Sequence, residues 1–247
     1  MRGVALGICP QATLVDITHE VAAQDVLGGA LELAAAYKYF PQETIFLCVV
    51  DPEVGSRRRG LAAEAGGYRF VAPDNGLLTV VFRETPPSQV VELGNPQYAR
   101  PVLSRTFEGR DRFAPAAAWL ANGIELSALG TSVAKWEMLT IAEPTAGAGE
   151  LRGMVVRIDR FGNLITNVDR RSFEAFAGDR RVDIDVDRHH LERLVQTYSE
   201  VETGSLCALF GSSDHLEVAV NGGSAVERLA VSRGASVVVR LKPALTA

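Results

Sequence analysis

The chain has 247 residues, 47% of them hydrophobic and 22% charged, and its 25 Lys and Arg against 30 Asp and Glu give a formal net charge of −5. This length and composition support one or two folded domains, and they exclude disordered, collagen-like and disulfide-dense proteins. The acidic balance argues against duplex nucleic acid as a partner, because proteins that bind it carry basic surfaces.

The first 142 residues alternate β-branched runs with helical stretches. Residues 1–8 resemble the end of a helix, residues 12–17 predict a strand, and the Ala- and Leu-rich residues 25–40 predict a helix that begins at an Asp. The apolar run 44–50 is typical of a strand covered on both faces. We therefore expect residues 1–142 to form an α/β domain with a mostly parallel sheet.

Two further signals follow in the same domain. β-branched and apolar runs at 68–72 and 77–82 flank the sequence PDNG at 73–76, in which Pro fixes φ and Asn-Gly tolerates a positive φ, so a turn is predicted there. Residues 111–122 predict a helix that ends at Gly123.

The composition then changes. Residues 143–150, EPTAGAGE, are small and Pro- and Gly-containing without periodicity, which predicts a linker. Beyond it, short β-rich runs separated by turn residues predict a smaller, antiparallel, barrel-like β domain over residues 151–247. The runs are 154–158, 182–186, 206–210, 216–220 and 237–241. Two domains provide a crevice, which is a usual place for a small-molecule site.

Cysteine usage and hydropathy bear on the compartment. The three cysteines, Cys9, Cys48 and Cys207, are odd in number and far apart, which favours a reduced, cytoplasmic protein. No apolar run approaches the roughly 20 residues of a membrane helix, and the first residues fit a signal peptide poorly. We expect a soluble protein that does not bind membranes.

Most catalytic motifs are absent from the sequence, including complete GxGxxG, GxSxG, HExxH, P-loop and CxxC patterns. His189 and His190 lie in a charged stretch, where a solvated surface is more common than a metal site. Three other segments carry polar groups next to predicted elements: residues 51–59 and 159–163 each follow a strand, and residues 107–111 precede a helix. Ligands of α/β sheets bind beyond the carboxyl ends of strands; the structural alternatives are a capped loop, a turn and a helix cap.

Taken together and in order, six segments closely resemble the S-adenosyl-L-methionine (SAM) hydrolase family, also called SAM hydroxide adenosyltransferases, which are relatives of the fluorinating and chlorinating enzymes. They are VDITHEV (15–21), VVDPEVGSRRR (49–59), APDNGLL (72–78), TFEGRDRFAPAAAWLA (106–121), IDRFGNLITNV (158–168) and LEVAVNGGSA (216–225). The resemblance covers essentially the whole chain. It implies a homotrimer whose sites lie between the N-terminal domain of one subunit and the C-terminal domain of its neighbour.

The reaction that the resemblance implies is SAM plus water giving adenosine and L-methionine, by displacement at C5′ of the ribose. The sulfonium leaves as a neutral thioether, so no metal and no cofactor is expected; a positioned, partly desolvated water is needed instead. In the family an Asp, an Arg and a His hold this water. Asp51 and Arg58 match the first two, and Glu108 stands in place of the His.

The Glu at this position leaves two functions open. An ionised Glu108 can accept the proton of the attacking water as a general base. If it instead forms a structural salt bridge with Arg58 or Arg110, the protein is a non-catalytic binder of adenosine or SAM. Halogenation is disfavoured, because the halogenases place Tyr where Asp51 stands and a carboxylate there repels halide.

The resemblance also implies the substrate-binding residues. They are Gly109 beside the catalytic group, Asp159 for the α-amino group, Asn163 for the zwitterion, Phe161 in the same turn, Ser212 for the carboxylate, Ser213 where the halogenases have Arg, and the main chain around Asn221 and Gly222 for the adenine edge.

Family members begin with an apolar strand ending in an Asp-Phe-Gly segment whose Asp binds the ribose hydroxyls. The present sequence starts beyond the equivalent point. We expect the natural protein to have further residues upstream of Met1, which translation of the genomic sequence would test.

Overall fold

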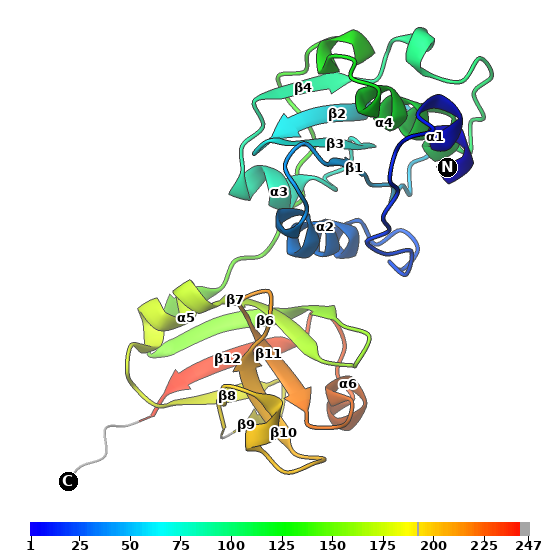
Figure 1. Ribbon diagram of the computed structural model, residues 1–247. Helices are drawn as coiled ribbons and strands as arrows, with labels where there is room; N and C mark the ends of the chain where they lie inside the picture. Colours follow the sequence, from blue (N-terminus) through cyan, green and yellow to red (C-terminus); the bar gives the residue numbers. More distant parts are fainter. Residues whose placement is uncertain (192, 243–247) are drawn as a thin grey trace. The chain divides into compact units, whose positions relative to one another are not determined.

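The computed structural model describes residues 1–191 and 193–242 (Figure 1). They fall into two compact units, Met1–Thr140 and Ile141–Ala247. The N-terminal unit contains the sheet strands β1 (Ile45–Leu47), β2 (Gly60–Ala65), β3 (Tyr68–Pro73) and β4 (Gln89–Glu92).

The N-terminal sheet is mixed, so the expectation of a mostly parallel sheet is wrong. Its strand order is β1-β3-β2-β4; β1 and β3 are parallel, and β2 is antiparallel to both of its neighbours. The reason is a two-residue turn, Gly66-Gly67, in which both residues have positive φ (59° and 78°). Such a turn joins consecutive strands into a hairpin, which makes them antiparallel neighbours.

Helices cover both faces of this sheet (Figure 1). On one face, Leu33 packs with Phe46 and Phe70 of the sheet. On the other face, Leu120 packs against Val71. The helical elements are α1 (Arg2–Ile8), α2 (Val26–Ala36), η1 (Tyr37–Tyr39), α3 (Thr79–Glu84), η2 (Pro96–Tyr98), the π-helix η3 (Gly109–Phe113), α4 (Ala114–Ala121) and η4 (Leu126–Leu129).

The predicted helices are confirmed, with two differences elsewhere. The helix predicted over residues 25–40 is α2 with η1, capped by the Asp25 carboxylate, which accepts from the Gly28 N–H. The helix over residues 111–122 is confirmed as η3 and α4. Residues 12–17 do not form a strand, since no described strand pairs with them. They are largely exposed. The run after PDNG forms helix α3.

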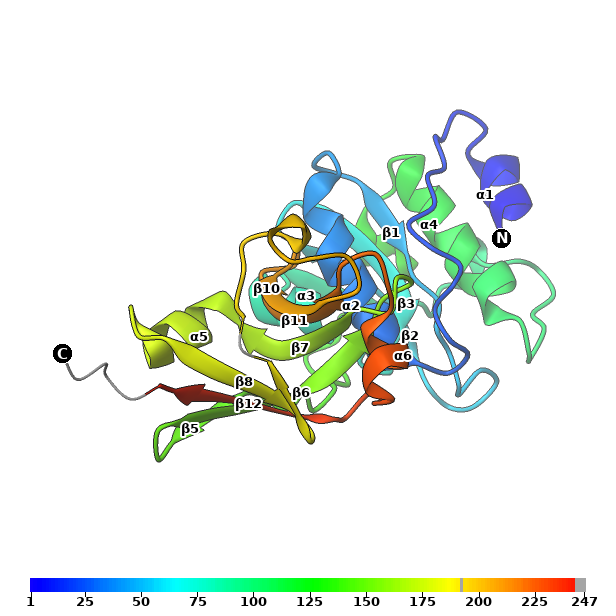
Figure 2. The same ribbon diagram turned by 90° about the horizontal axis from the view of Figure 1, so that it is seen from below.

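The C-terminal unit is an antiparallel β structure, as predicted. Its strands are β5 (Thr145–Gly147), β6 (Glu150–Ile158), β7 (Leu164–Asp169), β8 (Val182–Val186), β9 (His189–Leu191), β10 (Leu206–Phe210), β11 (His215–Val220) and β12 (Ser236–Leu241). They form one sheet in the order β10-β11-β7-β6-β12-β8-β9, with β5 on β6; Figure 2 shows β8, β12 and β6 side by side. A bridge between Leu194 and Ala208 brings the segment after β9 to β10, so the sheet nearly closes into a barrel.

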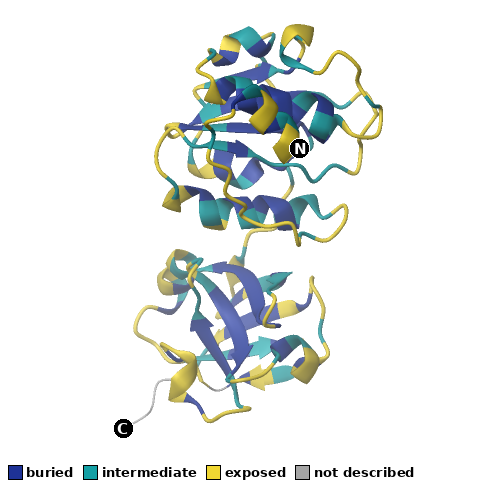
Figure 3. Cartoon of the chain, turned by 45° about the vertical axis from the view of Figure 1, so that its right-hand side comes forward, coloured by how far each residue is buried: buried dark blue, intermediate teal, exposed yellow. Residues whose placement is uncertain are grey.

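Three short helices accompany the barrel: α5 (Arg170–Ala177), η5 (Tyr198–Glu200) and α6 (Ala225–Leu229). Phe173 of α5 and Leu229 of α6 pack into the barrel core with Leu164 and Leu216, and Figure 3 shows the buried residues along the strands. Part of the expected linker 143–150 is strand β5, which a turn at Ala148-Gly149 folds back onto β6. No helix among the described residues is long and apolar enough to span a bilayer.

Candidate active site

Arg58 links two carboxylates from different loops of the N-terminal unit. Its Nη2 donates to Asp51 Oδ2 at 2.7 Å and to Glu108 Oε2. The side chains of Arg58, Asp51 and Glu108 are 2%, 5% and 14% exposed. The structure therefore brings together all three residues that the sequence identified as catalytic candidates.

The topology explains this meeting. Asp51 lies beyond the end of strand β1, Arg58 lies just before β2, and Glu108 directly precedes the π-helix η3. The Asn75 amide of the PDNG turn donates to the Val50 carbonyl at 2.8 Å, so this turn fixes the chain immediately before Asp51. π-Helical turns are rare and are found frequently at functional sites.

The loop between Asp51 and Arg58 packs closely on the segment before Glu108. Gly55 has φ 82°, and a Cβ at this position would lie 2.2 Å from the Arg105 carbonyl oxygen. Only glycine combines this conformation with so close an approach. The contact holds the two loops that carry the two carboxylates against one another.

Asp111, one turn after Glu108, anchors the same segment. Its side chain is fully buried and accepts hydrogen bonds from the Ser104 N–H (2.8 Å), Arg110 Nε (2.7 Å) and Arg100 Nη1 (3.1 Å). Hydrogen bonds from Arg110 above all hold the pKa of Asp111 well below its usual range. Arg110 thus pairs with Asp111, and the residue that pairs with Glu108 is Arg58, with Arg112 at 3.9 Å.

The ring of Phe113 packs against the Arg58 guanidinium, whose Cζ lies 5.3 Å from the ring centroid. A Cβ on Gly60 of β2 would lie 2.4 Å from Phe113 Cε1, so this glycine leaves the room that the ring occupies. A cation over an aromatic face is stabilised by the ring quadrupole. The position of Arg58 therefore depends on strand β2 as well as on the two loops.

The electrostatics of the group are unusual. Burial raises the pKa of Asp51 above its ordinary value, and the nearby Arg58 only partly opposes this effect. Asp51 Oδ1 and Arg58 Nε are buried without a hydrogen-bond partner among the described residues. With one guanidinium between two carboxylates the group favours a cationic ligand, and the unused acceptor of Asp51 suits a small donor such as water.

A second group of candidates lies in the C-terminal unit, around a pocket of about 350 Å³. Asp159, Phe161, Asn163, Ser212 and Ser213 all line this pocket. The pocket lies at one end of the barrel, between the β6–β7 turn and the β10–β11 turn. The structure therefore brings together five of the substrate-binding residues that the sequence identified.

Comparison with known proteins identifies the family. The model of the SAM hydroxide adenosyltransferase N-terminal domain matches residues 1–130, and that of the SAM hydroxide adenosyltransferase C-terminal domain matches residues 153–238. The chain belongs to the SAM hydroxide adenosyltransferase family.

Individual relatives agree with this family. A protein of Thermus thermophilus named (R)-S-adenosyl-L-methionine hydrolase is 38% identical, over 96% of this chain and 91% of its own. A fluorinase of Actinoplanes is 30% identical, over 70% and 67%. The crystal structure of an uncharacterised conserved protein from Thermotoga maritima superposes with a TM-score of 0.91 at 34% identity, covering 97% of this chain and 93% of that one.

Two substrate-binding candidates lie outside the C-terminal pocket. Asn221 and Gly222 follow β11 and are not among the lining residues. The main chain of Asn221 is already bonded, to Ser205 and Gly204, and its side chain donates to the Val201 carbonyl at 2.8 Å. Asn221 thus stabilises the 201–205 loop, and recognition of an adenine edge here stays a prediction.

Gly109, the remaining candidate, is buried at the start of η3. A Cβ at this position would lie 2.9 Å from Met1 Sδ and 3.5 Å from Val49 Cγ1. Its contact with a substrate also stays a prediction.

Sequence reasoning missed five polar residues of the C-terminal pocket. They are Arg157, Gln196, Thr197, Tyr198 and Glu217, which line it beside the five predicted residues. Glu217 is 6% exposed within the strand LEVAV of β11. A charged residue in an otherwise apolar, buried strand is the signal that could have identified it.

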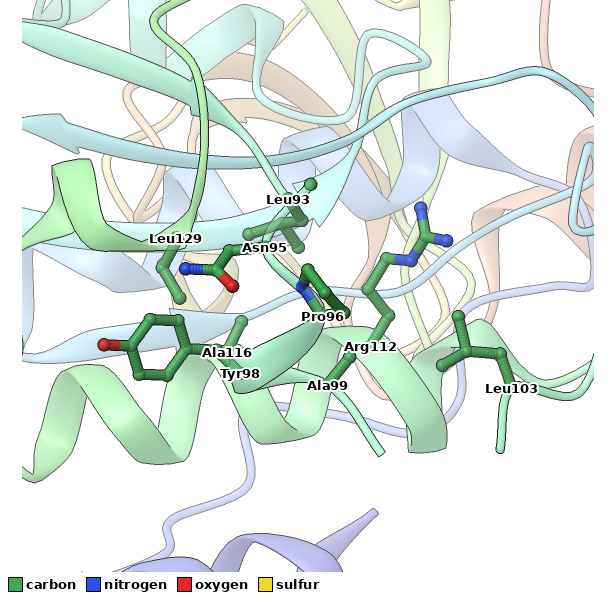
Figure 4. A pocket seen from close by; sticks show the side chains of 10 residues that line it. Leu93, Asn95, Pro96, Tyr98, Ala99, Leu103, Arg112, Ala116 and Leu129 are labelled. Atoms are coloured by element: carbon green, nitrogen blue, oxygen red, sulfur yellow. The ribbon is translucent and has the colours of Figure 1, made fainter. Parts of the chain in front are cut away.

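Among the described residues, the small N-terminal cavity and the metal-ligating side chains provide no comparable group. A small cavity of about 80 Å³ lies by the segment Pro96–Tyr98 and Leu129, with Arg112 at its rim (Figure 4). It is smaller than the few hundred Å³ typical of ligand sites. Among residues 1–191 and 193–242, no three His, Cys, Asp or Glu side chains are grouped so as to hold a metal ion.

Proposed function

We propose that the protein hydrolyses SAM to adenosine and L-methionine. The observation that carries the proposal is Arg58, buried between Asp51 and Glu108 with one acceptor of Asp51 unused. Relatives named (R)-S-adenosyl-L-methionine hydrolase, at 35% to 38% identity, support the same activity.

The proposed chemistry needs only the residues of this group. A water held by Asp51 and Arg58 attacks C5′ of the ribose. As the C–O bond forms, the C–S bond breaks and its electron pair stays on sulfur, so that methionine leaves as a neutral thioether. Glu108 accepts the proton of the water. Positioning and desolvation of the water account for the acceleration, because the sulfonium is already a good leaving group.

The two carboxylates have different environments that suit these roles. Asp51 is the more deeply buried of the two and has its pKa raised by that burial. Glu108 is more open and has a second arginine, Arg112, 3.9 Å from its other oxygen. Glu108 is thus the carboxylate that can pass its proton on to solvent after each turnover.

Substrate recognition is assigned on the family resemblance and on the shared pocket. Asp159, Phe161, Asn163, Ser212 and Ser213 bind the methionine end, and Gly109, Asn221 and Gly222 contact the remainder of the substrate. We further propose a homotrimer in the cytoplasm, in which one subunit supplies Asp51, Arg58 and Glu108 to a site and its neighbour supplies the C-terminal pocket.

The test is to incubate the purified protein with SAM and to follow adenosine and methionine by chromatography. We expect both products in equal amounts, and Asp51→Ala as the control should release neither above background. SAM binding by calorimetry without adenosine release would contradict hydrolysis and indicate a non-catalytic binder. No binding of SAM or adenosine would contradict both functions.

A further inference from the structure

The C-terminal pocket contains a buried carboxylate to which the proposed function assigns no role. Glu217 is 6% exposed and lines the pocket from β11, where the neighbouring residues Leu216, Val218 and Ala219 are fully buried and apolar. Burying a carboxylate costs free energy unless a partner compensates its charge. A compensating partner is therefore the first thing to look for.

The protein supplies only part of that compensation. Within the described chain Glu217 accepts one hydrogen bond, from the Tyr198 hydroxyl to Oε1 at 2.7 Å. Its Oε2 lies against Gly211, where a Cβ would be 2.2 Å away. Gly211 thus leaves this oxygen room at the pocket wall, and a carboxylate can accept several hydrogen bonds.

Asp159, the other carboxylate of the pocket, is already bonded through both of its oxygens. Its Oδ1 accepts from the N–H groups of Phe161 (2.8 Å) and Asn163 (2.9 Å), and its Oδ2 accepts from the Asn163 side-chain amide at 3.0 Å. These bonds close the turn between β6 and β7. Most acceptor positions of Asp159 are therefore occupied by the turn, whereas Glu217 keeps more acceptor capacity for a ligand.

The charges of the pocket favour a cation. Asp159 and Glu217 contribute two negative charges and Arg157 contributes one positive charge. Burial raises the pKa of Glu217, Asp159 raises it further, and Arg157 and the Tyr198 hydrogen bond oppose the shift. A cationic group at Oε2 would complete the compensation, and the aromatic side chains of Phe161 and Phe210 would cover its apolar stem.

We propose that Glu217 binds the ammonium group at the amino-acid end of the substrate, and that it selects sulfonium nucleosides that carry this ammonium over those that lack it. Tyr198 acts as a positioning residue that fixes the carboxylate. This inference rests on the proposed function and adds to it a residue that determines specificity.

The test compares SAM with its desamino analogue, in which hydrogen replaces the amino group. Glu217→Gln keeps the size of the side chain and the acceptor for Tyr198, and removes the charge. We expect the KM for SAM to rise on the order of 10- to 100-fold, as for loss of a charged hydrogen bond, with kcat little changed. The kcat/KM for the desamino analogue should stay the same, so that the variant no longer discriminates between the two compounds.

Two further variants complete the design. Glu202→Gln, an exposed glutamate outside the pocket, is the matched control and should behave as wild type. Tyr198→Phe should raise the KM for SAM less than Glu217→Gln does and leave the analogue unaffected. Should Glu217→Gln not fold, as judged by circular dichroism, Tyr198→Phe tests the same selectivity.

Equal losses of kcat/KM for both compounds, or no change for either, would overturn the role of Glu217. The wild type is assayed in parallel, so failure of the proposed function is seen separately. If it binds SAM without turnover, the same comparison is made with dissociation constants from calorimetry. A selective loss of SAM affinity in Glu217→Gln then supports the inference even though hydrolysis is absent.

Discussion

Arg58 donates to both carboxylates through one nitrogen, Nη2. The three side chains therefore form one hydrogen-bonded group, and a change at one alters the contacts of the others. At the residue scale, substitutions of Glu108 and Asp51 can test the two proposed roles, Glu108 as proton acceptor and Asp51 in holding the water.

Replacing Glu108 by Gln should lower kcat for SAM cleavage by about 100- to 10,000-fold, the usual contribution of a general base. The KM should change little, because the amide oxygen can still accept from Arg58. Adenosine release under saturating SAM measures the effect. Glu125→Gln, an exposed glutamate of the same unit, is the control. A Glu108→Gln variant with wild-type kcat would show that Glu108 is only structural.

The dependence of kcat/KM on pH should reflect the protonation of Asp51. Burial raises the pKa of this carboxyl, so it takes up a proton at a higher pH than an exposed Asp, whose pKa is about 4. Since the proposed role requires the ionised form, kcat/KM should fall as the pH decreases through an apparent pKa above about 4. Initial rates of adenosine formation between pH 4 and 8 test this, and an acid limb at or below about pH 4 would contradict it.

At the scale of elements, Gly60 and Phe113 connect the sheet to the catalytic group. Gly60→Ala places a methyl group 2.4 Å from Phe113 Cε1, so the ring must move and Arg58 above it loses its support. We expect a loss of about 1–3 kcal/mol in the free energy of unfolding, as for overpacking, together with a lower kcat.

Urea denaturation and the SAM assay measure the two effects of Gly60→Ala. Gly3→Ala is the matched control, because a Cβ there meets nothing within 4 Å and Gly3 lies in helix α1. That substitution should stabilise the protein by about 0.5–1 kcal/mol. Equal stability of the two variants would show that Phe113 moves without cost.

The elements also show what a single sequence reveals. Short β-rich runs between turn residues predict five of the eight described strands of the C-terminal unit, whereas β5, β7 and β9 were not predicted. The sequence analysis did not predict the hairpin at Gly66-Gly67 or the mixed sheet that it produces. Strands that alternate with helices ordinarily pair in parallel, and this pattern conceals one antiparallel hairpin. Residues 12–17 have the composition of a strand, but strand formation also needs a partner, which composition does not report.

The candidate site was predictable to a similar degree. Asp51 and Glu108 stand next to predicted elements, and the motif order brought them together with Arg58. Glu217 was missed because it lies inside a predicted strand, where polar residues ordinarily face solvent. In the structure β11 pairs with both β7 and β10, and Glu217 is 6% exposed.

On the scale of the whole molecule, the proposed catalytic group and the pocket belong to different compact units, Met1–Thr140 and Ile141–Ala247. The proposed trimer joins them across subunits, in a closed ring of heterologous contacts. This arrangement makes a prediction that depends on the assembly and not on any one residue.

Asp51→Asn and Glu217→Gln subunits, each impaired in a different unit, should complement each other when they are mixed, dissociated and reassembled. In random mixtures of equal amounts, about one quarter of inter-subunit sites combine two intact halves, so about one quarter of wild-type activity at low SAM should return. Reassembled samples of each variant alone are the controls. If each site lies within one subunit, mixing restores nothing.

The shared nitrogen of Arg58 has a consequence for how the site can change over time. If either carboxylate is replaced, the buried Arg58 guanidinium still has the other carboxylate as a partner. A single substitution therefore does not leave a buried, uncompensated positive charge. The residue at position 108 is therefore not required to neutralise Arg58. A different side chain, and with it a different proton acceptor, can be accommodated there while the protein still folds.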